Sequence, residues 1–135
     1  MTVQLSVAVR NARADVVEST IGTSPILRIR TGAQPANCAA SRTGTVLASL
    51  TLPSDWMGAA SSGAKALSGT WQDSSADNPG TAAHFEIMDS GGTTCHLQGS
   101  VTATGGGGDL TVDNTSFASG QSFSITSFGW TEPNA

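Results

Sequence analysis

The chain has little charge, few aromatic side chains and no tyrosine. Charged residues make up 12% of its 135 residues, aromatic residues make up 5%, and the only lysine is Lys65. Soluble domains usually contain about a quarter charged residues. A surface poor in charge and rich in serine, threonine and glycine suits strands that contact other protein surfaces better than it suits a lone, highly soluble monomer.

The small number of basic residues and the lack of long apolar runs argue against two classes of partner. Six Lys and Arg residues stand against ten Asp and Glu residues, which gives a net charge of −4, and the basic positions do not cluster. Binding to a phosphate backbone needs such a cluster, so we expect no nucleic-acid partner. No apolar run reaches membrane-spanning length, so we expect no membrane partner. Because residues 1–4 lack the charged and apolar parts of a signal peptide, we expect synthesis and retention in a cytoplasm.

No catalytic, cofactor or metal motif is present in the sequence. Gly105 to Gly108 lacks the Lys-Ser/Thr pair and the helix of a phosphate-binding loop, and is expected to be a loop between strands. There is no Gly-x-Ser-x-Gly elbow, and the aspartates lack the alternate spacing of a calcium loop. His84 and His96 are expected to be surface residues on a polar sheet face. We therefore expect a protein that is not an enzyme and holds no cofactor and no metal.

The two cysteines, Cys38 and Cys95, admit two interpretations. A reducing cytoplasm makes free thiols the expected state, with a disulfide as the less favoured alternative. A metal held by Cys95 and His96 is disfavoured further, because adjacent strand residues point to opposite faces.

An N-terminal helix is predicted over residues 3–21, with Thr2 as its cap and Gly22 as its stop. Its apolar residues fall at i, i+4, i+7 and i+11, which places them on one stripe. The stripe consists of Leu5, Val9, Ala12 and Val16. Two roles remain open for residues 1–22: a helix packed on its own sheet, or an arm that docks on a neighbouring subunit.

The rest of the chain, residues 23–135, alternates apolar and polar residues in short runs at hairpin spacing. This pattern predicts an all-β domain, an antiparallel β-sandwich or jelly roll of about seven strands, with a bulge near Ser127. The predicted strands are 26–31, 45–52, 65–72, 82–88, 93–103, 110–112 and 121–130. The predicted inward residues of the C-terminal strands are Phe85, Ile87, Leu97, Val101, Leu110, Val112, Phe123 and Ile125.

Seven stretches of the chain carry a resemblance to a known family. They are VRNARADVVESTIG (9–22), LRIRTGAQPANCAA (27–40), LPSDWM (52–57), LSGTWQD (67–73), GTAAHF (80–85), TTCHLQG (93–99) and GGGGDLTVDNT (105–115). Together they resemble a family of small virion proteins of tailed bacteriophages, common in phages and prophages of proteobacteria. The resemblance covers nearly the whole chain. It implies a particle component made in the host cytoplasm, and it transfers no catalytic residue.

The expected function is therefore that of a non-enzymatic virion structural protein, most simply a capsid decoration (cement) protein that stabilises the head shell. Its expected partners are the major capsid protein and further copies of itself. The alternatives are a tail, baseplate or fibre accessory bound to tail proteins, and a carbohydrate-binding receptor module that uses Trp56 or Trp130. The residues expected at a partner interface are Leu5, Val9, Ala12, Val16, Trp56 and Trp130.

Overall fold

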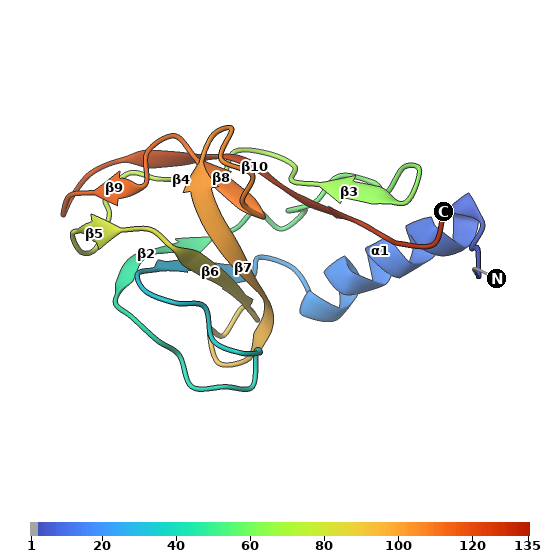
Figure 1. Cartoon of the computed structure of the whole chain (residues 1–135), viewed down its shortest axis with the longest axis horizontal. Coiled ribbons are helices and arrows are strands. Elements are labelled where there is room, and N and C mark those ends of the chain that lie inside the picture. The colour runs from blue at the N-terminus through green and yellow to red at the C-terminus, as the bar shows by residue number, and fades with distance from the viewer. Residues whose placement is uncertain (1–2) are drawn as a thin grey trace.

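The computed structural model describes residues 3–135, which form one helix and a set of mostly short strands (Figure 1). The helix α1 spans Val7–Ile21. The strands are β1 (Ile26–Arg30), β2 (Val46–Thr51), β3 (Ala64–Ala66), β4 (Gln72–Asp73), β5 (Gly80–Thr81), β6 (His84–Met88), β7 (Cys95–Ala103), β8 (Leu110–Val112), β9 (Ser116–Phe117) and β10 (Phe123–Thr131). The prediction of a mostly β fold with one N-terminal helix is confirmed.

Within the described range, eight strands form one mixed sheet and two form a small separate one. The order in the large sheet is β2-β1-β6-β7-β8-β10-β3, with β4 also paired to β10, while β5 pairs with β9. β7 and β8 run parallel, with Val101 opposite Leu110. The prediction of a purely antiparallel arrangement is therefore wrong for this pair, and the strand pairing does not clearly define a sandwich or a jelly roll.

The glycine run accounts for the short connection between these two parallel strands. Parallel neighbours usually need a crossover of a dozen or more residues, yet only residues 104–109 separate β7 from β8. Gly105 and Gly107 have φ angles of 85° and 82°, a conformation that glycine adopts without steric cost. The amide of Gly108 then donates to Thr102 Oγ1 at 3.0 Å and closes the loop.

The helix begins later than the sequence predicts and ends where it predicts. Ser6 is the N-cap, and its hydroxyl accepts a hydrogen bond from the amide of Val9 at 3.3 Å. The amide of Leu5 instead donates to the carbonyl of Asn134 at 2.7 Å, which ties the residues before the cap to the C-terminal segment. Thr2, the predicted cap, lies outside the described residues. Gly22, with φ of 92°, ends the helix as predicted.

The alternation of apolar and polar residues predicted the positions of most of the other strands correctly. β6 and β7 form the predicted hairpin, and the register of β10 shifts between Ile125 and Ser127, where the bulge is predicted. The segment 65–72 is an exception, because it divides into β3 and β4. Gly69, with φ of 76°, interrupts it. β5 and β9, each of two residues, were not predicted.

The predicted inward residues form the hydrophobic core. Seven of the eight are buried, and Leu97 is half-buried and packs against them. The ring of Phe85 meets the ring of Phe128 edge-on, with centroids 5.4 Å apart. Phe128 in turn contacts Trp71 at 5.5 Å, and Trp71 contacts Trp56 at 6.1 Å. This chain of aromatic contacts joins β6 to β10 and to the segment after β2.

Replacing Phe85 by alanine should destabilise the domain by about 3–5 kcal/mol, because the fully buried ring leaves a cavity that its neighbours cannot fill. Denaturant unfolding of the purified variant measures this loss. Val16→Ala, at a 59% exposed position of α1, is the control and should change stability by less than about 0.5 kcal/mol. Unchanged stability in Phe85→Ala would mean that this face of β6 is not a core face.

Candidate functional site

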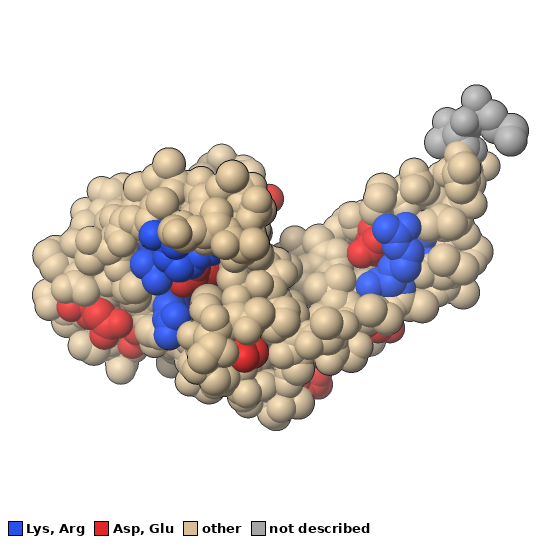
Figure 2. Space-filling model, turned by 90° about the horizontal axis from the view of Figure 1, so that it is seen from below, with Lys and Arg blue, Asp and Glu red and all other residues tan. Residues whose placement is uncertain are grey.

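The helix α1 extends away from most of the β-strands as an arm, with β3 and the C-terminal segment beside it (Figures 1 and 2). Two valines on its outer face are exposed, Val9 by 45% and Val16 by 59%. Ala12 lies between them and is also exposed. The predicted stripe therefore occupies the outer face of α1, except for Leu5, which precedes the helix and is half-buried. We call Val9, Ala12 and Val16 the valine face.

A different face of α1 packs against the rest of the chain. Its inward residues are Arg10, Ala14, Val17 and Ile21. At 100° per residue this face is rotated by roughly 140° from the predicted stripe. The helix thus packs on its own domain, which was one of the two open possibilities, but it does so without covering the valine face. The other possibility was docking on a neighbouring subunit, and the valine face, which would make that contact, stays exposed.

Lys65, on the edge strand β3, holds the C-terminal half of α1. Its ammonium group donates to Asp15 Oδ1 at 2.6 Å and lies 2.8 Å from Glu18 Oε2, and the lysine side chain is only 3% exposed. Burial lowers the pKa of Lys65, but the hydrogen bonds to Asp15 and Glu18 outweigh it and raise that pKa above its ordinary value. The hydrogen bond from Lys65 lowers the pKa of Asp15.

Arg10 holds the N-terminal half of α1 and is buried although it is charged. Its Nε and Nη2 donate to the carbonyl of Glu132 at 3.0 and 2.8 Å. Gly63 lies beneath the guanidinium group: a Cβ at this position would come within 2.5 Å of Arg10 Cζ. The amide of Gly63 also donates to Asn11 Oδ1 at 2.8 Å. These contacts and those of Lys65 fix both halves of the arm on the sheet edge.

A shallow groove continues the valine face toward the C-terminal segment. Its lining consists of Val9, Ala12, Arg13, Val16, Val17 and Glu132. Arg13 Nε pairs with Glu132 Oε2 at 3.3 Å on one side of it. The groove is therefore apolar along its length and carries an ion pair at its rim, which is the arrangement of a protein contact surface.

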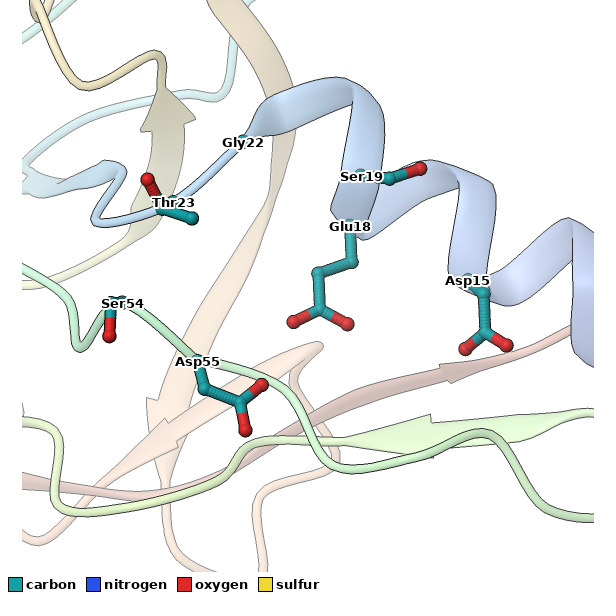
Figure 3. A pocket seen from close by; sticks show the side chains of 7 residues that line it. All are labelled: Asp15, Glu18, Ser19, Gly22, Thr23, Ser54 and Asp55. Atoms are coloured by element: carbon teal, nitrogen blue, oxygen red, sulfur yellow. The ribbon is translucent and has the colours of Figure 1, made fainter.

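A second hollow lies between the C-terminal end of α1 and the segment that follows β2 (Figure 3). Carboxylates of Asp15, Glu18 and Asp55 line it, with Ser19 and Ser54 beside them. Lys65 pairs with the first two carboxylates. Among residues 3–135 no group of three or more His, Cys, Asp or Glu side chains is arranged to hold a metal ion.

The two tryptophans predicted at an interface are not on the open surface. Trp56 is fully buried, and its Nε1 donates to the carbonyl of Gly22 at 3.0 Å. The prediction that Trp56 contacts a partner is corrected: it is a core residue that links the end of α1 to the sheet. Trp130 is half-buried and packs against Phe128, with ring centroids 5.9 Å apart. Trp56 therefore offers no open face on which a sugar stacks.

A buried polar cluster, missed by the sequence analysis, lies on the outer face of β6. Glu86 is fully buried and accepts hydrogen bonds from Arg30 Nε and Arg42 Nη1, each at 3.0 Å. His84 is 1% exposed, and its Nδ1 lies 3.0 Å from the carbonyl of Gly32. The segment 31–45 covers this face, so the expected solvent-exposed position of His84 is wrong. His96 is exposed, as predicted.

Comparisons with protein-family models, with curated proteins and with solved structures found no match. In the part of the chain that the structure describes, no helix is long and apolar enough to cross a membrane. The contacts of α1 and of the segment 31–45 are therefore the structural basis for assigning a role.

Replacing Lys65 by methionine should loosen the arm, because it leaves the carboxylates of Asp15 and Glu18 one helical turn apart without their cation. We expect the melting temperature to fall by roughly 3–8 °C and amide exchange in α1 to rise more than in β6. Arg13→Met is the matched control, since it removes a cation whose side chain is 48% exposed, and it should shift the melting temperature by less than about 2 °C. An equal rise in amide exchange in α1 and in β6 would show that Lys65 does not hold the arm.

The same contacts give α1 a defined pH dependence. The folded pKa of Asp15 lies below its ordinary value of 3.8, so its contribution is present above that value and is lost as pH falls through the folded pKa. The folded pKa of Lys65 lies above its ordinary value of 10.5, so its contribution is present below that value and is lost as pH rises further. Amide exchange in α1 should therefore be constant from about pH 5 to 10, after correction for intrinsic rates, and should rise outside that window.

Proposed function

We propose that this protein is a non-enzymatic virion structural protein of a tailed bacteriophage, and that it decorates and cements the capsid. The observation that carries the proposal is the valine face, an apolar surface on an arm whose other side is fixed by buried polar contacts. The proposed partners are the major capsid protein and further copies of the chain. The resemblance of the sequence to small virion proteins supports the same class.

The arm is unusual because charged groups are buried on its inner side, beside Ala14 and Ile21, while valines are exposed on its outer side. Arg10 and the side chain of Lys65 are buried on the inner side of α1, while Val9 and Val16 face outward. A helix that only packed on its own domain would normally bury its apolar residues. Each valine that becomes covered on docking would contribute roughly 1 kcal/mol. The pattern is thus the one that a helix needs when its apolar side binds another protein.

The contacts at the base of the arm suit repeated docking on a fixed lattice. Lys65, Arg10 and the Leu5 amide each connect the arm to the sheet edge or to the C-terminal segment. A surface that is ordered before binding loses less conformational entropy when it docks. A cement protein binds across joints between shell subunits and stabilises the assembled shell by mass action. A preformed apolar arm beside a β-domain meets that requirement.

We further propose that the large sheet forms a sandwich-like body behind the arm. What supports this is the position of the aromatic core: Phe85 on β6 contacts Phe128 on β10, although β7 and β8 lie between these strands in the sheet order. In Figure 1 the long strand β7 crosses between the part that contains β6 and the part that contains β10. Such a body is compact and carries the arm at one end.

Two aspartates on the valine face should abolish incorporation into the particle. The variant is Val9→Asp with Val16→Asp, and we expect its copies per purified particle to fall by more than about tenfold, since it places two charges in an apolar contact. Ser74→Asp with Ser119→Asp is the charge-matched control, because both serines are exposed and lie outside α1. The control should bind like the natural chain. The melting temperatures of both variants should match that of the natural chain.

Particle reconstruction decides where the copies lie. Many copies on the head lattice, with α1 against the shell, are the result that the cement role requires. Copies confined to one vertex or to the tail would replace it by the tail, baseplate or fibre role. Point substitutions are preferred to deletion of residues 1–22, because deletion would also remove Ile21 from the core and the two carboxylates that pair with Lys65.

A further inference from the structure

The two cysteines of the chain meet in space although 57 positions separate them in the sequence. Cys38 lies in the segment 31–45 and Cys95 is the first residue of β7, and their sulfur atoms are 2.7 Å apart. Both are free thiols and half-buried. We propose that Cys38 and Cys95 are a disulfide site that closes when the protein leaves a reducing compartment, and that the bond locks the segment 31–45 onto the sheet.

The segment that the bond would lock is attached to β6 and β7 through side-chain contacts. No helix or strand occurs in residues 31–45. Arg42 is its main anchor: its guanidinium group donates to Glu86 at 3.0 Å and to Gln98 at 3.1 Å. It also donates to the carbonyls of Asn37, Cys38 and Ala40. By binding the sheet and the backbone around Cys38 at once, Arg42 places Cys38 beside Cys95.

The surroundings of the two sulfurs assign them different roles in the exchange. Arg42 Nη1 lies 3.5 Å from Cys95 Sγ. Burial, followed by the hydrogen bond with Cys38, nevertheless raises the pKa of Cys95 to about 12. Cys95 therefore keeps its proton near neutral pH, and its Sγ lies within hydrogen-bonding distance of the sulfur of Cys38 and of the carbonyl of Leu97. Cys38 is then the thiol that attacks first, and Cys95 is the one that resolves the mixed disulfide.

The reaction is a thiol–disulfide exchange with a low-molecular-weight disulfide such as oxidised glutathione as the oxidant. The Cys38 thiolate, having released its proton to solvent, attacks one sulfur of the oxidant and expels one glutathione thiolate. Cys95 then loses its proton, attacks the sulfur of Cys38 in the mixed disulfide and expels the second thiolate. Both thiolates take up the released protons. The two cysteine sulfurs have lost two electrons, and one oxidised glutathione has become two reduced molecules.

The bond would add a long covalent loop to the fold at little structural cost. The sulfurs already lie close together, so neither β7 nor the segment 31–45 needs a long-range movement. A cross-link over 57 positions removes much of the freedom of the unfolded chain. Thiols should persist in the cytoplasm where the protein is made, whereas the bond should persist in an oxidising exterior. Whether Cys38 and Cys95 are thiols or a disulfide thus depends on the redox state of the compartment, and no protein partner is required.

Treatment of the reduced, purified protein with oxidised glutathione tests the proposal. Alkylation after denaturation should give two adducts before treatment and none after it, with no disulfide between two chains and no glutathione attached. The melting temperature should rise by roughly 5–15 °C on oxidation. Cleavage by trypsin after Arg42 should slow by about tenfold, because the segment that contains it opens less often.

Cys38→Ser and Cys95→Ser are the matched controls, since serine is close to cysteine in size. Cys38→Ser should react slowly with glutathione, Cys95→Ser should stop at the mixed disulfide, and neither should gain thermal stability on oxidation. Two remaining adducts, a disulfide-linked dimer, or a bond that leaves the melting temperature and the cleavage after Arg42 unchanged would each overturn the proposal. None of these measurements depends on particle binding, so they test the bond separately from the virion role.

Discussion

The buried ammonium group of Lys65 is the interaction on which the geometry of the arm depends. Removing a charge from water costs several kcal/mol, and this cost is offset here because Asp15 and Glu18 lie one helical turn apart on α1 and both reach the same ammonium group. A rotation of the helix would separate the carboxylates from Lys65 and leave the charge uncompensated. The ion pairs therefore determine which face of α1 points inward, and so which face stays exposed.

Glu86 plays the corresponding part on the other side of the molecule. Because β6 is central in the sheet, its apolar residues face the core and its polar residues need a cover of their own. The segment 31–45 supplies that cover through Arg42, which reaches Glu86 from a position 44 residues away. The same contact brings the backbone of Cys38 toward Cys95. A buried carboxylate thus organises a segment without regular secondary structure and positions the two thiols.

The sequence predicts the parts of the fold that local periodicity controls. Strands such as β6 and β7 were found because their apolar residues keep one parity, and the stop at Gly22 because glycine tolerates positive φ. Pairings of charges over long distances leave no local signal, so the burial of Arg10, His84 and Glu86 was missed. The position of Trp56 was predicted wrongly for a related reason. A tryptophan beside a strand end is compatible with a surface or a core position, and the hydrogen bond from Trp56 to the carbonyl of Gly22, which favours the core position, leaves no local signal in the sequence.

The low charge of the outer surface and the exposure of the valines both follow from where the cations and the valines lie in the fold. Arg10 and Lys65 are buried, and Arg30 and Arg42 contact Glu86. Arg13 pairs with Glu132 and Arg28 donates to the carbonyl of Gly92, so all six cations make internal contacts. Few positive charges are left to attract a partner from a distance. The valine face carries no charge of its own, and screening by salt acts on charges rather than on apolar area. Association through this arm must therefore draw its free energy from buried apolar surface and from the fixed orientation that Lys65 and Arg10 impose on the helix.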